Sequence, residues 1–340
     1  MEIGLDYESE ETLGGNIVTV NAEGVLRSWG CSESEIGKLF ERFPSMRKYG
    51  PDTLQSKLNI LGSLGLTASD LIRTVQCRPR LFRYSLNKRF DERIEYFLGL
   101  FKTKEVLRKV ILRNPSLLTY NFENQIKPVV SLYEEIGITG NDFVLMLLSR
   151  PTLIPRTSLN DEKWDYIHKT GVSKESKMYK YVVTLVAISR VETIREKLAN
   201  IEKFGLSTEE VLGLIGRSPY LLTMSTEKVQ RNMTFVCGTM KMSPQVVVKL
   251  PVLLQLNLES KLKPRFRLVK KIEEMGLVSK VEESRFLSAI RMTEKRFIEV
   301  FIDCYPQDVA QELMEFYTNM KCVKRLAESS KKEVRKGFPF

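Results

Sequence analysis

The stretch Arg113-Asn114-Pro115-Ser116-Leu117-Leu118 recurs along the chain in both directions. Five good copies place a basic residue just before a proline and two apolar residues shortly after it. The other four are Cys77-Arg78-Pro79-Arg80-Leu81-Phe82, Ser149-Arg150-Pro151-Thr152-Leu153-Ile154, Arg217-Ser218-Pro219-Tyr220-Leu221-Leu222 and Lys249-Leu250-Pro251-Val252-Leu253-Leu254. A diverged copy, Arg42-Phe43-Pro44-Ser45-Met46, precedes them. So many copies indicate a repeat protein.

The spacing of the motif prolines supports this interpretation. Successive prolines lie 35, 36, 36, 68 and 32 residues apart. The step of 68 spans two periods, and a copy at Val183-Thr184-Leu185-Val186, with valine in place of proline, divides it into 32 and 36. This period predicts a solenoid, in which each unit buries its apolar face against its neighbours.

Each unit is expected to contain two helices. Ile126, Val129, Val130 and Tyr133 recur at helical spacing, and Gly137 ends that first helix. A second helix follows from about residue 141 and stops before the next motif proline, because the residue before a proline is disfavoured in the α region.

Other signals agree with an all-α chain. Ser207 and Glu210 form a capping box at the start of another second helix, and no segment shows the alternation of a strand. The two apolar residues after each proline are expected to fold back as a short turn between adjacent units. The sequence therefore predicts an α-solenoid.

Charge points to a polyanionic partner. The formal net charge is +11, although residues 1–24 carry six acidic and no basic residues. Residues 25–340 therefore hold 53 basic and 42 − 6 = 36 acidic residues, a balance of +17. Such an excess favours nucleic acid, whereas a basic solvated face is the alternative explanation.

Nothing in the sequence indicates an enzyme. His168 is the one histidine and has no metal-ligand spacing beside it, the five cysteines lack a C-x-x-C pair, and no phosphate-binding glycine motif occurs. We expect reduced thiols, no catalytic residue, no metal and no cofactor. The apolar runs are far shorter than the roughly 18 residues of a membrane helix, so a soluble protein is expected.

A basic residue precedes the motif proline in every good copy, and stacking would align these residues in a row. We call this set the ladder: Arg42, Arg78, Arg113, Arg150, Arg217 and Lys249. Cations at regular spacing on one wall of a groove can follow a phosphate backbone. The structural alternative is that each satisfies carbonyl groups at a helix end, which stabilises by about 0.3–1 kcal/mol.

A second basic cluster lies in residues 261–271, which contain no acid. Lys263, Arg267, Lys270 and Lys271 share one helical face, which predicts a further contact with nucleic acid or an acidic protein. The tail, residues 319–340, is also basic and is expected to act as a flexible clamp or a solubilising end.

The repeated Pro-x-Leu-Leu phrase, followed by a first helix and a second helix that ends at the next proline, resembles the mTERF family of mitochondrial transcription termination factor-like proteins. The segment Met292-Thr293-Glu294-Lys295-Arg296-Phe297-Ile298-Glu299-Val300-Phe301 is similar to the end of plant members. The resemblance covers about residues 25–318. It implies a superhelix of repeats, each with two longer helices and a short 3₁₀ turn, curved around a basic concave groove.

The resemblance also implies work in a mitochondrion or plastid, on double-stranded DNA in transcription or on RNA in splicing or ribosome assembly. Two features depart from the family pattern: Val183 replaces a motif proline, which is expected to kink the array, and the acidic N-terminus is unlike a transit peptide.

The resulting prediction is a non-enzymatic regulator of organellar transcription that binds double-stranded DNA along its groove. Residues 1–24 form an acidic disordered segment, residues 25–318 the solenoid and residues 319–340 the tail. Alternatives are an organellar RNA-binding factor, which predicts exposed aromatic side chains beside the ladder, and a protein-interaction scaffold, which predicts a large apolar patch. Organellar protein partners, but no membrane, are expected, with the mitochondrion preferred. The nucleic-acid-binding residues are Arg78, Arg113, Arg150, Arg217, Lys249, Lys263, Arg267 and Lys270.

Overall fold

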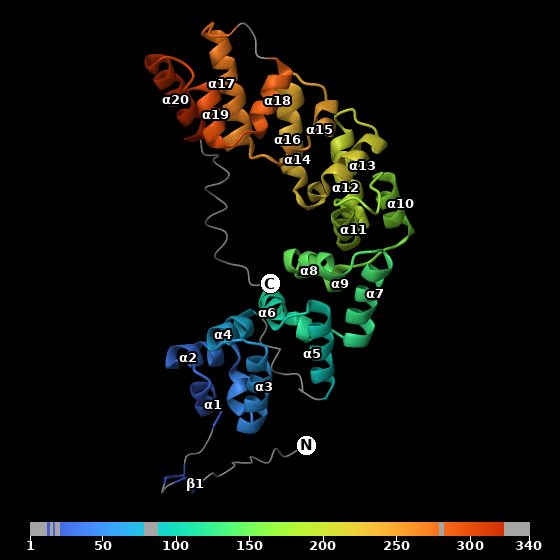
Figure 1. Cartoon of the computed structure of the whole chain (residues 1–340), viewed down its shortest axis with the longest axis vertical. Coiled ribbons are helices and arrows are strands. Elements are labelled where there is room, and N and C mark those ends of the chain that lie inside the picture. Colours follow the sequence, from blue (N-terminus) through green and yellow to red (C-terminus); the bar gives the residue numbers. More distant parts are fainter. Residues whose placement is uncertain (1–11, 14–15, 18–20, 78–87, 279–281, 323–340) are drawn as a thin grey trace. The chain divides into compact units, whose positions relative to one another are not determined.

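Short helical turns follow the motif prolines of the described chain, and two of them, α9 (Leu153–Arg156) and α16 (Val252–Gln255), are labelled in Figure 1. Three are 3₁₀ turns: η1 (Pro44–Lys48), η3 (Pro115–Leu118) and η5 (Pro219–Thr223). Single α-helical turns, α9 and α16, follow the motif prolines Pro151 and Pro251. The predicted turn after the proline is therefore confirmed.

The residue before each of these prolines shows why the preceding helix stops. Phe43, Asn114, Arg150, Ser218 and Leu250 all have φ between −144° and −130° and ψ between 71° and 79°. This conformation lies outside the α region, from which the proline ring excludes its predecessor. One local steric rule thus sets five helix ends.

The computed structural model describes residues 12–13, 16–17, 21–77, 88–278 and 282–322, and the chain divides into two units at Thr157 and Ser158. The remaining elements of unit 1 are β1 (Thr12–Leu13), β2 (Asn16–Ile17), α1 (Ala22–Ser28), α2 (Glu33–Arg42), α3 (Pro51–Ser63), α4 (Ala68–Cys77), α5 (Lys88–Phe101), α6 (Lys104–Arg113), η4 (Phe122–Ile126), α7 (Lys127–Glu135) and α8 (Gly140–Ser149). In this unit α2 packs on α4, α4 on α6 and α6 on α8, so successive second helices are neighbours.

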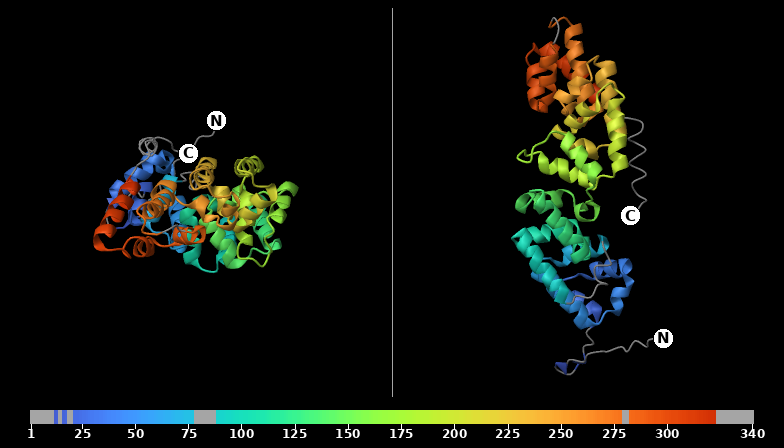
Figure 2. Two further views of the ribbon diagram at one scale, coloured as in Figure 1. Left: turned by 90° about the horizontal axis from the view of Figure 1, so that it is seen from above. Right: turned by 90° about the vertical axis from the view of Figure 1, so that its right-hand side faces the viewer.

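Unit 2 has the same organisation. Its remaining helices are α10 (Asp161–Lys169), α11 (Tyr179–Ile188), α12 (Val191–Glu202), α13 (Thr208–Arg217), α14 (Thr226–Thr234), η6 (Phe235–Thr239), α15 (Gln245–Lys249), η7 (Leu258–Leu262), α17 (Lys263–Glu274), α18 (Glu283–Arg291), α19 (Glu294–Phe301) and α20 (Gln307–Cys322). First helices pack in series, α12 on α14, as do second helices, α11 on α13 and α13 on α15. Figure 2 shows unit 2 progressing in chain order from α10 towards α20, which closes on α17.

Other sequence signals are also confirmed. Gly137 has φ +83° just past α7, the left-handed conformation that favours glycine at a helix C-terminus. The Ser207 and Glu210 side chains form the predicted capping box. The all-α repeat class is confirmed. Apart from β1 and β2, which pair over only two residues each, the described elements are helices and helical turns. The basic groove and the boundaries at 24 and 318 stay predictions.

The middle repeat differs from its neighbours. Its diverged motif, Val183–Val186, is not a turn but lies inside α11. Valine keeps its amide N–H and imposes no restriction on the residue before it, so the helix continues through the motif. The motif residues Leu185 and Val186 are nevertheless buried, as are the corresponding pairs Leu117 and Leu118, Leu153 and Ile154, Leu221 and Leu222, and Leu253 and Leu254.

Candidate nucleic-acid interface

The ladder residues lie at the C-terminal ends of second helices. Arg42, Arg113, Arg217 and Lys249 are the last residues of α2, α6, α13 and α15, and all four are exposed. Arg150 directly follows α8 and is half-buried. Arg78 lies outside the described residues. Arg42, Arg113, Arg217 and Lys249 thus share one register, two residues before the motif proline, and Arg150 lies one residue closer to its proline.

Two ladder arginines contact the next repeat. Arg113 Nη1 donates to the carbonyl oxygen of Leu148 at 2.6 Å, and Arg217 Nη1 donates to that of Val248 at 2.6 Å. Both acceptors lie three residues before the next motif proline, among the carbonyls that a helix end leaves without a helical partner. The structural role considered for the ladder is therefore real for these two arginines.

That role does not use the whole guanidinium group. A guanidinium carries five N–H donors, and each carbonyl bond occupies one of them. Because both side chains are exposed, the same group can donate to a second acceptor in solvent. A backbone oxygen on one side and a phosphate oxygen on the other are compatible partners.

The 261–271 cluster is not a single basic face. Arg265 is fully buried, and its Nη1 donates to the carbonyl oxygens of Ala289 at 2.7 Å and Met292 at 2.9 Å, while its Nη2 pairs with Glu294 at 3.1 Å. It joins α17 to the end of α18 and the start of α19. Arg265 is close in sequence to the other basic residues of 261–271, but its buried side chain is not part of their surface.

The remaining cations of α17 lie at its surface. Lys263 pairs with Glu259 at 3.3 Å, Lys270 with Glu273 at 2.6 Å and Lys271 with Glu312 at 3.0 Å. Arg267 is exposed and forms no ion pair among the described residues. These pairs are partly exposed to solvent, where ion pairs contribute only about 0–1 kcal/mol, so a phosphate can compete for these lysines.

A second set of donors, on the first helices, was not predicted from the sequence. Lys163 donates to the carbonyl oxygen of Ala187 at 2.9 Å, and Asn232 Nδ2 to that of Leu253 at 2.7 Å. Lys163, Asn232 and Arg265 lie 12, 13 and 14 residues after Pro151, Pro219 and Pro251 respectively. All three are at most 4% exposed, and each reaches a turn or helix end of the following repeat. A polar side chain 12 to 14 residues after the motif proline was the signal that could have revealed them.

Glu294 is the centre of a small polar network at the end of unit 2. It accepts hydrogen bonds from Arg265 and from Tyr317 Oη at 3.0 Å, and it pairs with Lys321. Burial alone would raise the pKa of Glu294, but the hydrogen bonds from Lys321, Arg265 and Tyr317 outweigh it and the pKa is lowered. Burial raises the pKa of Tyr317 to about 12. The network ties α20 to α17 and α19.

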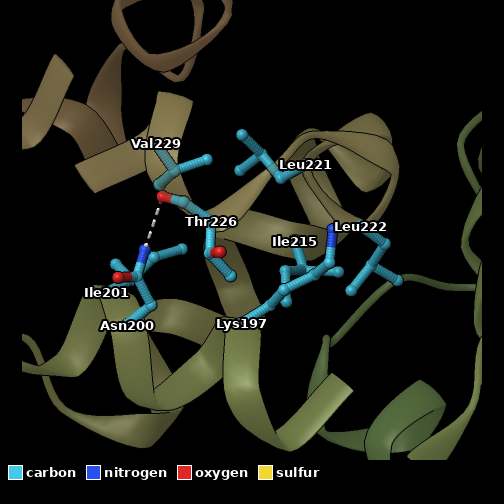
Figure 3. A pocket seen from close by; sticks show the side chains of 8 residues that line it. All are labelled: Lys197, Asn200, Ile201, Ile215, Leu221, Leu222, Thr226 and Val229. Carbon is cyan, nitrogen blue, oxygen red and sulfur yellow. Dashed lines mark hydrogen bonds between the residues drawn. The ribbon is translucent and has the colours of Figure 1, made fainter. Parts of the chain in front are cut away.

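The pocket in Figure 3 is a packing gap rather than a ligand site. Leucine, isoleucine and valine side chains from α12, α13, η5 and α14 line most of it, and its volume of about 10 Å³ holds roughly one water molecule. Lys197 donates to the carbonyl oxygen of Met224, and Asn200 Nδ2 donates to that of Thr226 at 3.2 Å. Both polar side chains are therefore engaged in joining repeats.

Other chemistry has little support in the described part of the chain. His168 is exposed and stacks on Trp164 with ring centroids 5.9 Å apart. No group of three or more histidine, cysteine or acidic residues that could hold a metal ion occurs among the described residues. Within the same residues, no helix combines the length and the apolar character needed to cross a membrane.

Comparisons with known proteins agree with the repeat pattern. The mTERF family model matches residues 24–97 and 81–298. Transcription termination factor 3, mitochondrial, of Drosophila melanogaster is 27% identical over 233 residues, covering 65% of this chain and 62% of the relative. Transcription termination factor MTEF18, mitochondrial, of Arabidopsis thaliana is 19% identical and covers 81% of this chain and 60% of the relative. Transcription termination factor MTERF8, chloroplastic, of Arabidopsis thaliana is 20% identical over 205 residues, covering 58% and 40%. The chain thus spans about three fifths of the first two relatives.

Proposed function

Because the chain belongs to the mTERF family, we propose that it is a nucleic-acid-binding regulator of organellar gene expression. It binds double-stranded DNA through the phosphate backbone and thereby affects transcription termination or initiation. The observation that carries this proposal is the register of the ladder. Exposed cations stand two residues before the motif proline at the ends of four described helices, α2, α6, α13 and α15.

The mechanism is backbone tracking. Each ladder cation neutralises one phosphate, and counterions are released as a result, so affinity falls steeply with salt. The carbonyl bonds of Arg113 and Arg217 hold their guanidinium groups in place before a ligand arrives, which reduces the entropic cost of binding. Within unit 1, Arg78 and Arg150 are further proposed phosphate contacts, and within unit 2, Lys263, Arg267 and Lys270 add proposed contacts on α17.

The cellular setting follows from the names of the relatives. They are mitochondrial or chloroplastic factors, which supports an organelle as the site of action and, with two of the three mitochondrial, a mitochondrion in preference. The relatives are named as transcription termination factors, and no catalytic role is proposed. Partners are nucleic acid and other proteins of organellar gene expression.

The scaffold alternative has less support. It predicts a large exposed apolar patch, but in the described part of the chain only two large hydrophobic residues, Leu145 and Tyr220, are markedly exposed. Solenoids that hold a protein partner on an apolar face need a contiguous surface of several hundred Å². Two separate side chains do not provide one.

The test uses cations without a structural partner among the described residues. In the full chain, Lys249→Gln with Arg267→Gln should reduce the slope of log affinity against log salt by about 0.9 for each phosphate of the duplex that is no longer neutralised. The measurement is fluorescence anisotropy with a random duplex across a salt series.

The matched control is Lys203→Gln, which removes one charge at an exposed residue just beyond α12, outside the ladder register. Its slope should stay at the wild-type value. A decrease in Lys203→Gln of half that in the double variant, which is the same decrease per charge removed, would mean that net charge alone, and not the ladder, attracts DNA. No decrease in the double variant would remove Lys249 and Arg267 from the interface.

A further inference from the structure

Two tyrosine rings meet at the surface of unit 2, where α11 packs against η5. The ring centroids of Tyr181 and Tyr220 lie 5.8 Å apart, with the ring planes at 43°. Tyr220 is 44% exposed, and Tyr181 is half-buried. An aromatic surface is therefore accessible next to the repeated motif.

The turn itself does not require an aromatic residue at this place. Tyr220 directly follows a motif proline, and the corresponding residues of the other described repeats are Ser45, Ser116, Thr152 and Val252. These small residues occupy η1, η3 and the starts of α9 and α16. An exposed tyrosine is thus a property of this repeat and not of the turn.

Tyr181 occupies the ladder register of the middle repeat. It lies two residues before Val183, the position that Arg42, Arg113, Arg217 and Lys249 occupy before their own prolines. The row of cations is therefore interrupted once in unit 2, and the residue that interrupts it carries an aromatic ring. The neighbouring repeat supplies the second ring.

Positive charge borders this aromatic pair. Lys180 Nζ lies 5.5 Å from the centre of the Tyr181 ring, and Arg217 is exposed three residues before Tyr220. Proteins that bind single strands combine cations for the backbone with aromatic rings on which bases stack. In a duplex each base is already stacked and paired, so its face is not accessible to a surface tyrosine.

We infer that Tyr181 and Tyr220 form a stacking site for an unpaired nucleobase, so that this repeat holds a single-stranded segment of nucleic acid. The inference rests on the proposed function for the backbone contacts and adds the base-binding component. Stacking tolerates any base, because every base has a π face. The site therefore selects single-stranded over duplex structure rather than a sequence.

The experiment measures binding of the full chain to an oligouridine of about 12 nucleotides and to a random duplex of equal length. Tyr220→Ala should weaken oligouridine binding about 5- to 150-fold and leave duplex binding unchanged. Tyr220→Phe keeps the ring and should bind oligouridine as the wild type does. The salt slope should not change in either variant, because no charge is removed.

Because Tyr220→Ala alters a packed turn, a second measurement uses the wild-type chain. An oligonucleotide of the same length whose central sites are abasic keeps the phosphates but lacks bases to stack, and it should bind more weakly than oligouridine. Equal affinity for the two, or equal weakening of duplex and single-strand binding by Tyr220→Ala, would overturn the inference. If the protein binds the duplex but wild type and Tyr220→Ala bind oligouridine with equal affinity, this inference alone is rejected. If the protein binds no nucleic acid, the proposed function is rejected as well.

Discussion

Arg217 and Arg265 perform the same hydrogen bonding in opposite surroundings. Each donates to backbone carbonyls of the following repeat, but Arg217 is exposed at the end of α13 and Arg265 is fully buried within α17. The buried arginine also reaches Glu294, so its charge is compensated inside the protein. Part of the positive charge of this repeat protein is therefore buried, has a structural role and is inaccessible to a ligand.

The largest expected effect comes from the buried member. Arg265→Ala should lower the free energy of unfolding by about 3–5 kcal/mol, because several carbonyl oxygens and Glu294 lose their donor in the interior. Urea unfolding followed by far-ultraviolet circular dichroism measures it. The control on the same helix is Arg267→Ala, a change at an exposed residue that should cost no more than about 0.5 kcal/mol. Equal effects would mean that burial does not separate the two classes.

A smaller effect is expected at Gly216, the residue before Arg217. A Cβ atom there would lie 2.7 Å from the carbonyl oxygen of Thr170 and 2.8 Å from Val172 Cγ2. Gly216→Ala should therefore destabilise the protein by about 1–3 kcal/mol, since backbone cannot move as a side-chain tip does.

Gly213→Ala, in the same helix, is its control. Nothing lies within 4 Å of the added methyl group, and alanine is favoured in a helix interior by about 0.5–1 kcal/mol. Thermal unfolding of the two variants should move in opposite directions. If both variants raise the midpoint, the close approach of Thr170 and Val172 to α13 does not restrict the side chain at position 216.

The smallest change in stability is expected for the exposed member. Arg217→Gln should cost about 0.3–1 kcal/mol, the value of a cation at a helix C-terminus, yet reduce the salt slope of duplex binding by about 0.9. Chemical unfolding and a salt titration on one protein preparation compare the two quantities. A large decrease in stability with an unchanged slope would place Arg217 with Arg265 as a structural residue.

Local signals in the sequence were sufficient for the helix ends. Pro115, Gly137 and the Ser207 capping box each act through residues close to them in the chain, and all three predictions are confirmed. Spacing alone locates the diverged motif at Val183–Val186, but the segment is part of α11 and not a turn, because Val183 does not interrupt a helix.

The burial of Arg265 could not be predicted in the same way. Its partners lie 24–29 residues further along the chain, and three of them are backbone carbonyls, which every residue carries. The sequence shows the charge of a side chain, but it does not show whether the fold brings a distant carbonyl oxygen within hydrogen-bonding distance. The exposed ladder residues Arg113 and Arg217 stay predicted nucleic-acid ligands, and their carbonyl bonds were considered only as helix capping.

The bonds between neighbouring repeats have a mechanical consequence. Arg113 to Leu148 and Arg217 to Val248 each connect one repeat to the next and no further. In a structure with nearest-neighbour coupling, tension along the chain is carried by such joints in series, and the weakest joint opens before the rest. A single molecule of this protein stretched between its ends should therefore lengthen in steps of about one repeat, with the order of steps set by the strength of individual joints.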